Sequence, residues 1–374
     1  MANVNLANAK SSKNDEFYTQ YYDIEKEVNA YLEYNPNVFK NKVILCPCDD
    51  PEWSNFTKYF AQNFERFKLK KLISTSYAFS SKGGKGKYLV TTFERKNKNF
   101  DKKKVEIKGK HFTLDKDRTG DNHIDITDLD YTYLDGDGDF RSEEVTKLRD
   151  EADIIVTNPP FSLFREFLAW IMKAKKQFLI ISNMNAITYK EVFPLIKNNK
   201  IWLGTKSTSK AMFFKTSDKE YASRVSSEKP EGSWWRKIGG EICIGINNSC
   251  WFTNLDHGRR HQRLSLMNMK DNLRYNSNLK NQDSYNNYDN YEGIEVSFTN
   301  AIPSDYNEVM GVPISFLDKY NPEQFEILKC SAYSDPKNFG SGALYVNGKK
   351  QYARILIKPI KIKPKKIKAN KQLK

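Results

Sequence analysis

Asn158-Pro159-Pro160-Phe161 is a run of residue types that could hold and activate a planar amino group. An amide side-chain oxygen and a proline carbonyl aimed at one point would accept two hydrogen bonds from an exocyclic amine. Such bonds favour a tetrahedral nitrogen whose freed lone pair can attack an activated methyl group, while the ring of Phe161 stacks on the base. The run therefore predicts methyl transfer to an amine such as N6 of adenine. The competing interpretation is a turn that merely ends a strand.

The flanking sequence places this run between a strand and a helix. Residues 153–157 (DIIVT) are a short β-branched run typical of a buried strand, and residues 162–171 carry apolar side chains at helical spacing behind a capping serine. Two prolines stiffen the connection, because each fixes its own φ and donates no N–H. Open α/β sheets bind ligands at the carboxyl ends of their strands, which is where the run is expected to lie.

Apolar strands and amphipathic helices alternate between residues 38 and 200, which indicates a parallel, doubly wound α/β sheet. Beyond residue 204 the sequence is more polar and irregular. Residues 241–255 have a strand pattern, and residues 271–293 are rich in Asn and Tyr, as in a long or partly disordered loop. We expect the following parts: a flexible arm at 1–16, a catalytic domain at 17–203 with a β-rich insertion at about 80–134, a target-recognition region at 204–300, a C-terminal α+β segment at 301–357 and a basic tail at 358–374.

The charge balance favours a polyanionic partner. Of 374 residues, 61 are Lys or Arg and 46 are Asp or Glu, which gives a net charge of +15. Nucleic acid is the first candidate and an anionic membrane surface the second, while a solvated lysine-rich surface is the bland alternative. No apolar run approaches the length of a membrane span and no signal peptide is evident, so we expect no membrane association. Five cysteines without framework spacing indicate reduced thiols and a cytoplasmic protein.

Three further patterns suggest ligands but fit them poorly. The acidic run beginning at Asp135 lacks the glycine and glutamate of a calcium loop, because Phe140 and Thr146 occupy those positions. Residues 83–87 (GGKGK) do not extend to a phosphate-binding motif and are typical of a basic hairpin tip. Zinc stays open at odds of roughly one in ten, because cysteines in an apolar strand usually belong to the core; its ligands would be Cys243, Cys250, His257 and His261. We expect no metal, since the methyl donor carries the activation.

Six segments of the chain occur in the order found in one known family. They are SKNDEFYTQYYDIE (12–25), CDDPEWSNFTKYF (48–60), GDGDFRSEE (136–144), NPPFSLFREF (158–167), WFTNLDHGRR (251–260) and GVPISFLDKYNPEQFEIL (311–328). In this ordered set, which covers most of residues 12–330, the chain resembles the EcoRI-type DNA adenine-N6 methyltransferases. The resemblance implies a Rossmann-like methyltransferase sheet with a second, irregular α+β DNA-recognition region, S-adenosyl-L-methionine as methyl donor, and an adenine of double-stranded DNA as acceptor.

The resemblance also implies roles for individual residues. Asn158, Pro159, Pro160 and Phe161 match the catalytic motif, and the cofactor-binding positions are Phe17, Tyr18, Thr19, Asp49, Asp50, Pro51, Asn55, Asp139, Phe140 and Asn158. The carboxylate of Asp139 would accept from the amino group of the cofactor's adenine, and the ring of Phe140 would stack on its face. For Asp49, a turn or helix-capping carboxylate is an equal alternative.

The chain departs from wider methyltransferase practice after its first strand. PEWSNF stands where a glycine-rich loop is usual, so Ser54 and Asn55 would have to allow the close approach of backbone and cofactor. The acid that usually binds the ribose is also not evident after the second strand, which leaves the ribose and carboxylate contacts open.

Acting on duplex DNA requires further residues. An adenine inside the duplex must be extruded before its N6 can react, and contacts between basic residues and phosphates would offset that cost. Region 204–300 is the predicted reader, because arginine pairs well with guanine and asparagine with adenine. Its predicted DNA-binding residues are Lys206, Lys210, Arg259, Arg260 and Arg263, although each taken alone fits an ordinary surface residue.

These observations leave three hypotheses of function. The first is a site-specific DNA adenine-N6 methyltransferase that acts as a monomer, either protecting DNA from a partner restriction endonuclease or working alone. The second is a methyltransferase that acts on another planar amine, such as an RNA adenine or a protein glutamine. The third is a catalytically dead DNA-binding scaffold, against which the intact NPPF run and the Asp139-Phe140 pair argue. The recognition sequence is not readable from the chain.

Overall fold

The chain forms two compact units. The computed structural model describes residues 17–51, 54–78, 95, 97–207, 210–216, 219–279 and 282–360. The units are Met1–Arg259 and Arg260–Lys374, whereas the sequence predicts boundaries near residues 203 and 300. The division differs because strands at 212–216 and 249–253 complete sheets of the first unit. The predicted arm at 1–16 and the tail beyond residue 360 lie outside the described residues.

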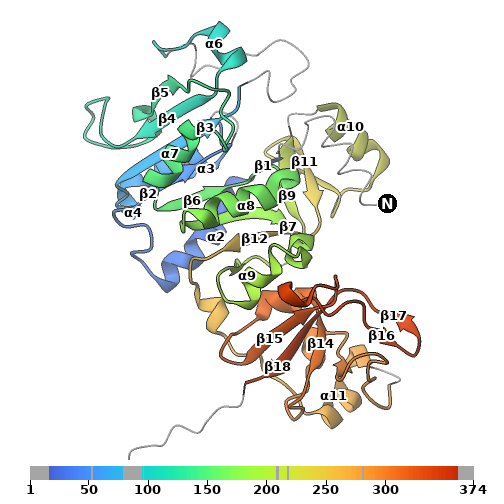
Figure 1. Cartoon of the computed structure of the whole chain (residues 1–374). Helices are drawn as coiled ribbons and strands as arrows, with labels where there is room; N and C mark the ends of the chain where they lie inside the picture. The colour runs from blue at the N-terminus through green and yellow to red at the C-terminus, as the bar shows by residue number, and fades with distance from the viewer. Residues whose placement is uncertain are drawn as a thin grey trace, which may run out of the picture. The chain divides into compact units, whose positions relative to one another are not determined.

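An eight-stranded sheet forms the centre of the first unit (Figure 1). Four parallel strands occupy its middle in the order β3-β2-β6-β7, and the strands at both edges are antiparallel. The chain runs outward from β2 to β3 and then returns to β6 on the other side of β2. The carboxyl ends of β2 and β6 therefore meet where the strand order reverses, which is where open α/β sheets bind ligands. In spatial order the strands are β5 (Asp130–Tyr133), β4 (Lys110–Leu114), β3 (Lys71–Ser76), β2 (Val43–Cys46), β6 (Ile154–Thr157), β7 (Gln177–Asn183), β12 (Ser249–Thr253) and β8 (Trp202–Leu203).

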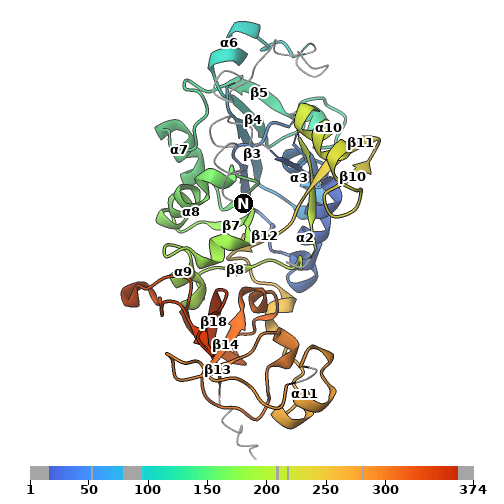
Figure 2. The same ribbon diagram turned by 90° about the vertical axis from the view of Figure 1, so that its right-hand side faces the viewer.

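Helices cover both faces of this sheet (Figure 2). On one face lie α2 (Tyr21–Tyr34) and α3 (Phe56–Gln62), and on the other lie α7 (Glu143–Glu151) and α8 (Phe164–Lys173). This arrangement confirms the predicted α/β class, although the sheet is mixed, with antiparallel strands outside the four parallel ones. The other helical segments described in the first unit are α4 (Phe64–Phe67), α6 (Lys102–Ile107), α9 (Phe193–Lys197), α10 (Lys219–Glu228), η1 (Ile126–Asp128), η2 (Phe161–Leu163) and η3 (Met184–Thr188), and η4 (Gly258–His261) spans the division between the units.

A second sheet joins the N-terminal strand to the chain beyond residue 204. Its strands are antiparallel and follow the order β1 (Phe17–Thr19), β9 (Met212–Thr216), β11 (Glu241–Ile246) and β10 (Trp235–Ile238). Met212 and Phe214 of β9 belong to the same apolar core as the helices α2 and α3. The single strand pattern predicted at 241–255 is two strands, because the chain turns at Asn248, whose φ is +67°, and β12 then enters the central sheet.

The predicted β-rich insertion and the Asn-rich loop are both ordered where the structure describes them. Strands β4 and β5 pair next to β3 and extend the central sheet, while residues 79–94 and 96, which include GGKGK, lie outside the described residues. In the Asn-rich segment, the buried Asn272 donates to the carbonyl of Met267 at 3.3 Å and Asn276 donates to that of Asn300 at 3.0 Å. These two amides hold loop backbone in place.

The second unit is built on a four-stranded sheet and a small hairpin. The sheet has the order β13 (Ile294–Glu295), β14 (Met310–Pro313), β18 (Arg354–Pro359) and β15 (Phe325–Cys330), and the hairpin consists of β16 (Tyr345–Val346) and β17 (Lys349–Lys350). The helical segments are α11 (Met269–Tyr275), η5 (Ser277–Leu279), η6 (Thr299–Ala301), η7 (Ile314–Lys319) and η8 (Pro336–Asn338).

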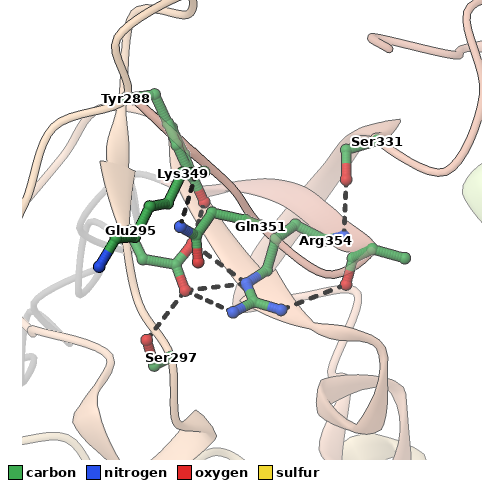
Figure 3. A network of polar contacts seen from close by, with 8 residues as sticks. Tyr288, Glu295, Ser297, Ser331, Lys349, Gln351 and Arg354 are labelled. Carbon is green, nitrogen blue, oxygen red and sulfur yellow. Dashed lines mark hydrogen bonds and ion pairs between the residues drawn. The ribbon is translucent and has the colours of Figure 1, made fainter. Parts of the chain in front are cut away.

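A buried polar network ties the strands of this second sheet together (Figure 3). Arg354 of β18 forms a forked ion pair with Glu295 of β13, with its Nη2 at 2.6 Å and its Nε at 2.9 Å from Oε1. The other carboxylate oxygen accepts from the hydroxyl of Tyr288 at 2.5 Å. Both charged side chains are more than nine-tenths buried, so their hydrogen bonds offset a large desolvation cost.

Candidate active site

The Asn158–Phe161 run forms a turn at the carboxyl end of β6, as the sequence predicts. Thr157, the last residue of β6, is fully buried and donates its hydroxyl to the carbonyl of Pro47 at 2.5 Å, which fastens the turn to the loop after β2. Pro159 is buried, and Phe161 is half-buried against the core on the α2 and α3 side. Leu163 donates its N–H to the carbonyl of Pro160 at 3.0 Å, which is the first hydrogen bond of the helical segment that follows the turn.

The loop after β2 is held by the carboxylate of Asp49. One oxygen accepts from the hydroxyl of Ser54, and the other accepts from the N–H of Thr57 at 2.9 Å and from its hydroxyl at 2.5 Å. Burial raises the pKa of Asp49 to about 6, against the effect of these hydrogen bonds. The carboxylate thus caps the first turn of α3, which was one of its two predicted roles; its contact with a cofactor stays a prediction.

The neighbouring Asp50 pairs with a lysine that the sequence analysis did not identify. The Nζ of Lys110 on β4 lies 3.0 Å from Oδ2 of Asp50, and both side chains are almost completely buried. Pro51, which follows, is buried as well. A signal for Lys110 existed in the alternation of KHFTL, because Lys110 shares a face with the buried Phe112 and Leu114.

The side-chain amide of Asn55 connects this loop to strand β1. Asn55 donates its Nδ2 to the carbonyl of Thr19 at 2.7 Å. Thr19 is fully buried, and Tyr18 is half-buried opposite Lys215 of β9. The structure therefore brings Asn55 of the predicted cofactor loop next to the predicted cofactor segment at 17–19, although β1 and β2 belong to two different sheets.

The predicted adenine-binding turn around Asp139 packs against the end of β3. Gly138 has a φ of +87°, and a side chain there would collide with the carbonyl of Ser76, so glycine is required. The N–H of Ala78 donates to the carbonyl of Asp137 at 2.7 Å. The turn therefore joins the same edge of the sheet as the loops after β2 and β6.

The side chains of Asp139 and Phe140 already have partners within the protein. Partial burial works to raise the pKa of Asp139, but hydrogen bonds and charge from Arg141 outweigh it and lower that pKa. The guanidinium of Arg141 also contacts Glu166 at 2.9 Å. The ring of Phe140 is fully buried against Phe167 and Trp170, so a stacking role for it stays a prediction that would require an open face.

The predicted DNA-binding residues are divided between the two units. The Nζ of Lys206 donates to the carbonyls of Lys210 and Ser249, and Arg259 donates to the carbonyl of Thr205. Lys210 is exposed. Arg260 and the exposed Arg263 belong to the second unit. Their contacts with DNA remain predictions.

A carboxylate on α2 organises the segment that carries Lys206. Glu27 is buried and accepts from the N–H of Thr205 at 2.7 Å and from that of Lys206 at 3.0 Å. Burial raises the pKa of Glu27 despite these hydrogen bonds. A side chain at Gly204 would collide with this carboxylate.

The four residues considered for zinc do not converge. Cys243 lies in β11 and Cys250 in β12, and these strands belong to different sheets. Nε2 of His257 lies 3.0 Å from the carbonyl of Leu203. Within the described ranges, no three His, Cys, Asp or Glu side chains are grouped as metal ligands, and no helix there is long and apolar enough to cross a membrane.

Sequence comparisons connect this arrangement to known proteins. Residues 5–360 match the family described as "Adenine-specific methyltransferase EcoRI". The chain is 44% identical to the type II methyltransferase M.EcoRI of Escherichia coli over 353 residues, which cover 94% of this chain and 95% of that protein. It is 34% identical to M.MgeORF184P of Mycoplasma genitalium and 33% identical to M.MpnI of Mycoplasma pneumoniae, with 94% of this chain and 97% and 96% of those proteins covered. No solved structure matches the chain.

Proposed function

The chain belongs to the EcoRI family of adenine-specific methyltransferases, and we propose that it transfers a methyl group from S-adenosyl-L-methionine to N6 of an adenine held at the turn after β6. It is a type II adenine-specific DNA methyltransferase, as are its relatives from restriction-modification systems. The observation that carries the proposed site is the hydrogen bond from Thr157 to Pro47. It links the predicted catalytic turn to the predicted cofactor loop across two adjacent parallel strands.

The residues at this edge of the sheet fit such a donor. The Asp139 carboxylate can accept from an adenine amino group, and Gly138 allows the turn that carries Asp139 to pack against the carboxyl end of β3. Residues 17–19 lie beside the loop that ends at Asn55. When bound, the cofactor supplies an electrophilic methyl group. The central sheet, with its switch point at β2 and β6, supports a Rossmann-like methyltransferase fold.

In the proposed reaction, the chain makes N6 of adenine nucleophilic. The side-chain oxygen of Asn158 and the carbonyl of Pro159 accept hydrogen bonds from the two N6 hydrogens, which frees the nitrogen lone pair. Pro160 stiffens the turn and Phe161, which is half-buried, stacks on the extruded base. The contacts made by these groups become stronger as charge develops on the nitrogen. Because they are stronger in the transition state than in the bound substrate, they accelerate the reaction.

The wider setting follows from the same proposal. Lys206, Lys210, Arg259, Arg260 and Arg263 would contact phosphates or bases of the duplex. All proposed reacting groups come from one chain, which supports action as a monomer. The type II names of the relatives support a cognate restriction endonuclease that cuts the same site. All five cysteines lie in the described part of the chain and none of them forms a disulfide there, which fits a reducing, cytoplasmic setting.

The test of the proposed site is Asn158→Ala, assayed with methyl-labelled S-adenosyl-L-methionine and mixed AT-rich duplex DNA. We expect label to appear as N6-methyladenine with the unaltered chain and to fall by at least about 100-fold in the variant, as for loss of one transition-state acceptor. The matched control is Asn198→Ala, an exposed asparagine at the end of α9, which should leave transfer unchanged. Equal transfer by both variants would reduce the NPPF run to a turn. Label in RNA or protein instead of DNA would change the substrate class.

A further inference from the structure

We propose that the β10–β11 hairpin, residues 235–246, enters the major groove of the DNA substrate, with Arg236 and Lys237 on phosphates and Trp234 against the edge of a base. The inference rests on duplex DNA being the substrate and adds a binding element made of residues other than the predicted DNA-binding ones. In Figure 2 the hairpin and α10 lie at the margin of the first unit, on the side away from α7 and α8.

The backbone of the hairpin has the shape that such a role requires. Trp235 to Ile238 pair with Ile244 to Glu241 in an unbroken antiparallel register. Gly239 and Gly240 both have positive φ, at +59° and +83°, as in the two-residue turn that matches the twist of a β-ribbon. The major groove of B-DNA is wide enough to admit a two-stranded ribbon of this kind.

The charges on the outer strand complement DNA. β10 is an edge strand, and Arg236 and Lys237 are exposed on it with no acid between Gly232 and Gly240. The nearest acid on the partner strand, Glu241, is engaged by Lys215 at 2.6 Å, so it does not neutralise this pair. The exposed Glu231 is the remaining acid of the segment, and its carboxylate accepts from the N–H of Lys237 at 3.4 Å.

The exposed apolar side chains distinguish DNA binding from a simpler role of the edge strand, which is to prevent association with other sheets. Charged residues on an edge strand commonly prevent edge-to-edge association, and Arg236 and Lys237 could serve that purpose alone. That purpose does not account for Trp234, which is 46% exposed, or Ile238, which is 38% exposed. In the major groove an apolar side chain can contact the methyl group of a thymine while neighbouring cations contact phosphates. The Nζ of Lys229 lies 5.2 Å from the ring centre of Trp234.

The position of Trp234 is fixed by its backbone. Its carbonyl accepts from the N–H of Gly245 at 2.7 Å, and a side chain at Gly245 would collide with the carbonyl of Ser233. The indole N–H of the next residue, Trp235, donates to the carbonyl of Lys229 at 2.8 Å. Because the segment is held on both sides, the ring of Trp234 is presented with little further ordering cost on binding.

The same sheet connects the hairpin to the proposed cofactor site. β10 is one edge of the four-stranded sheet, and the other edge is β1, whose Thr19 carbonyl accepts from Asn55. Two central strands, β9 and β11, join these edges through continuous backbone pairing. DNA gripped by the hairpin would therefore be held at a fixed distance from the cofactor-binding strand.

The experiment measures binding of a mixed AT-rich duplex to the full chain over a range of salt concentrations. Affinity for DNA falls as the salt concentration rises. Arg236→Gln combined with Lys237→Gln should make the plot of log affinity against log salt shallower by about 1.8, because each phosphate contact contributes about 0.9 to its steepness. Trp234→Ala should weaken binding about tenfold with the slope unchanged, because an apolar contact with a base edge contributes to affinity but releases no counterion. Arg236→Lys combined with Lys237→Arg should keep the slope.

The second hairpin of the molecule supplies matched controls. β16–β17 carries two exposed lysines, Lys349 and Lys350, and is followed by Tyr352, which is 87% exposed. Lys349→Gln with Lys350→Gln, and Tyr352→Ala, should leave affinity and slope unchanged. Equal effects at both hairpins, or no effect at β10–β11 while the unaltered chain methylates DNA, would overturn the inference and leave the proposed function standing. Affinity for the cofactor shows whether each variant is correctly folded. Absence of methyl transfer by the unaltered chain would instead refute the proposed function.

Discussion

Two buried ion pairs, one in each unit, show how differently the chain uses a carboxylate. Glu295 in the second unit has both oxygens engaged, by the fork of Arg354 and by the hydroxyls of Tyr288 and Ser297 (Figure 3). Asp50 in the first unit pairs with the ammonium of Lys110 at 3.0 Å. The forked pair of Arg354 and Glu295 ties strands of one sheet together. The pair of Lys110 and Asp50 instead joins β4 to the loop at the proposed cofactor site.

The difference teaches where the molecule can adjust. A guanidinium keeps its proton in any protein environment, so the pair with Glu295 has no cheap alternative state. A lysine ammonium can lose its proton and rotates freely about its stem. We therefore expect changes in the Glu295 network to act on stability and changes near Asp50 to act on binding.

The largest effect is expected for Glu295→Ala. The substitution leaves the buried guanidinium of Arg354 without its carboxylate, which should lower the free energy of unfolding by about 3–5 kcal/mol. Hydrogen exchange of the β14 and β18 amides in urea would measure this locally. Glu308→Ala removes the exposed pair with Lys358 and should cost under about 1 kcal/mol. Similar losses from both would contradict a special role for the network.

A pH dependence should follow from Asp49. Its folded pKa of about 6 lies above the ordinary value of 3.8, so the folded state binds this proton more tightly than the unfolded state. The stabilisation is present below about pH 4 and is lost as pH rises through 6, by up to about 3 kcal/mol. Asp49→Asn should remove this slope. Parallel unfolding curves of the two proteins from pH 4 to pH 7 would show that Asp49 is ionised throughout.

Asp50→Asn should cost less than Glu295→Ala. It removes the negative charge opposite Lys110, at about 2–3 kcal/mol in unfolding free energy. We expect a larger proportional loss in affinity for S-adenosyl-L-methionine, measured by calorimetry, because the substitution lies in the loop after β2. A variant that loses stability but binds cofactor normally would make Asp50 a structural residue like Glu295.

Two glycines of one turn give the smallest and sharpest contrast. Gly138→Ala should cost about 1–2 kcal/mol, because its φ is positive and its Cβ would collide with the carbonyl of Ser76. Gly136→Ala, whose Cβ would meet no atom within 4 Å, should stay within about 0.5 kcal/mol. Thermal unfolding of both variants checks the pair. Cofactor affinity should fall only for Gly138→Ala, since only that change displaces the turn carrying Asp139.

Local patterns in the sequence were sufficient to predict the parallel strands and the turn at Asn158. The β-branched run before Asn158 and the helical spacing after it specify their own structures, because burial on both faces demands continuous apolar strands. Partner choice is not local, and it could not be predicted. The pairing of β1 with β9 and the division of residues 241–255 between two sheets depend on strands far apart in the chain.

The site residues show the same difference between what local sequence specifies and what depends on distant parts of the chain. Asp49 and Asn158 follow strands directly, so their place at the sheet edge could be predicted. Lys110 comes from an antiparallel strand, and only its alternation with Phe112 and Leu114 hinted at burial. The partners of Asp139 and Phe140 come from α8 and from Arg141, so their occupied state depends on tertiary packing.

The pairing of β1 with β9 has a consequence for synthesis on the ribosome. Residues 17–19 emerge early, but their partner at 214–216 emerges only after all the parallel strands of the central sheet have been made. Closing so long a loop is entropically costly before the intervening sheet has folded. A nascent chain can therefore form the turn after β6 well before β1 is seated beside Asn55, and we expect competence to bind the proposed methyl donor to arise late in translation.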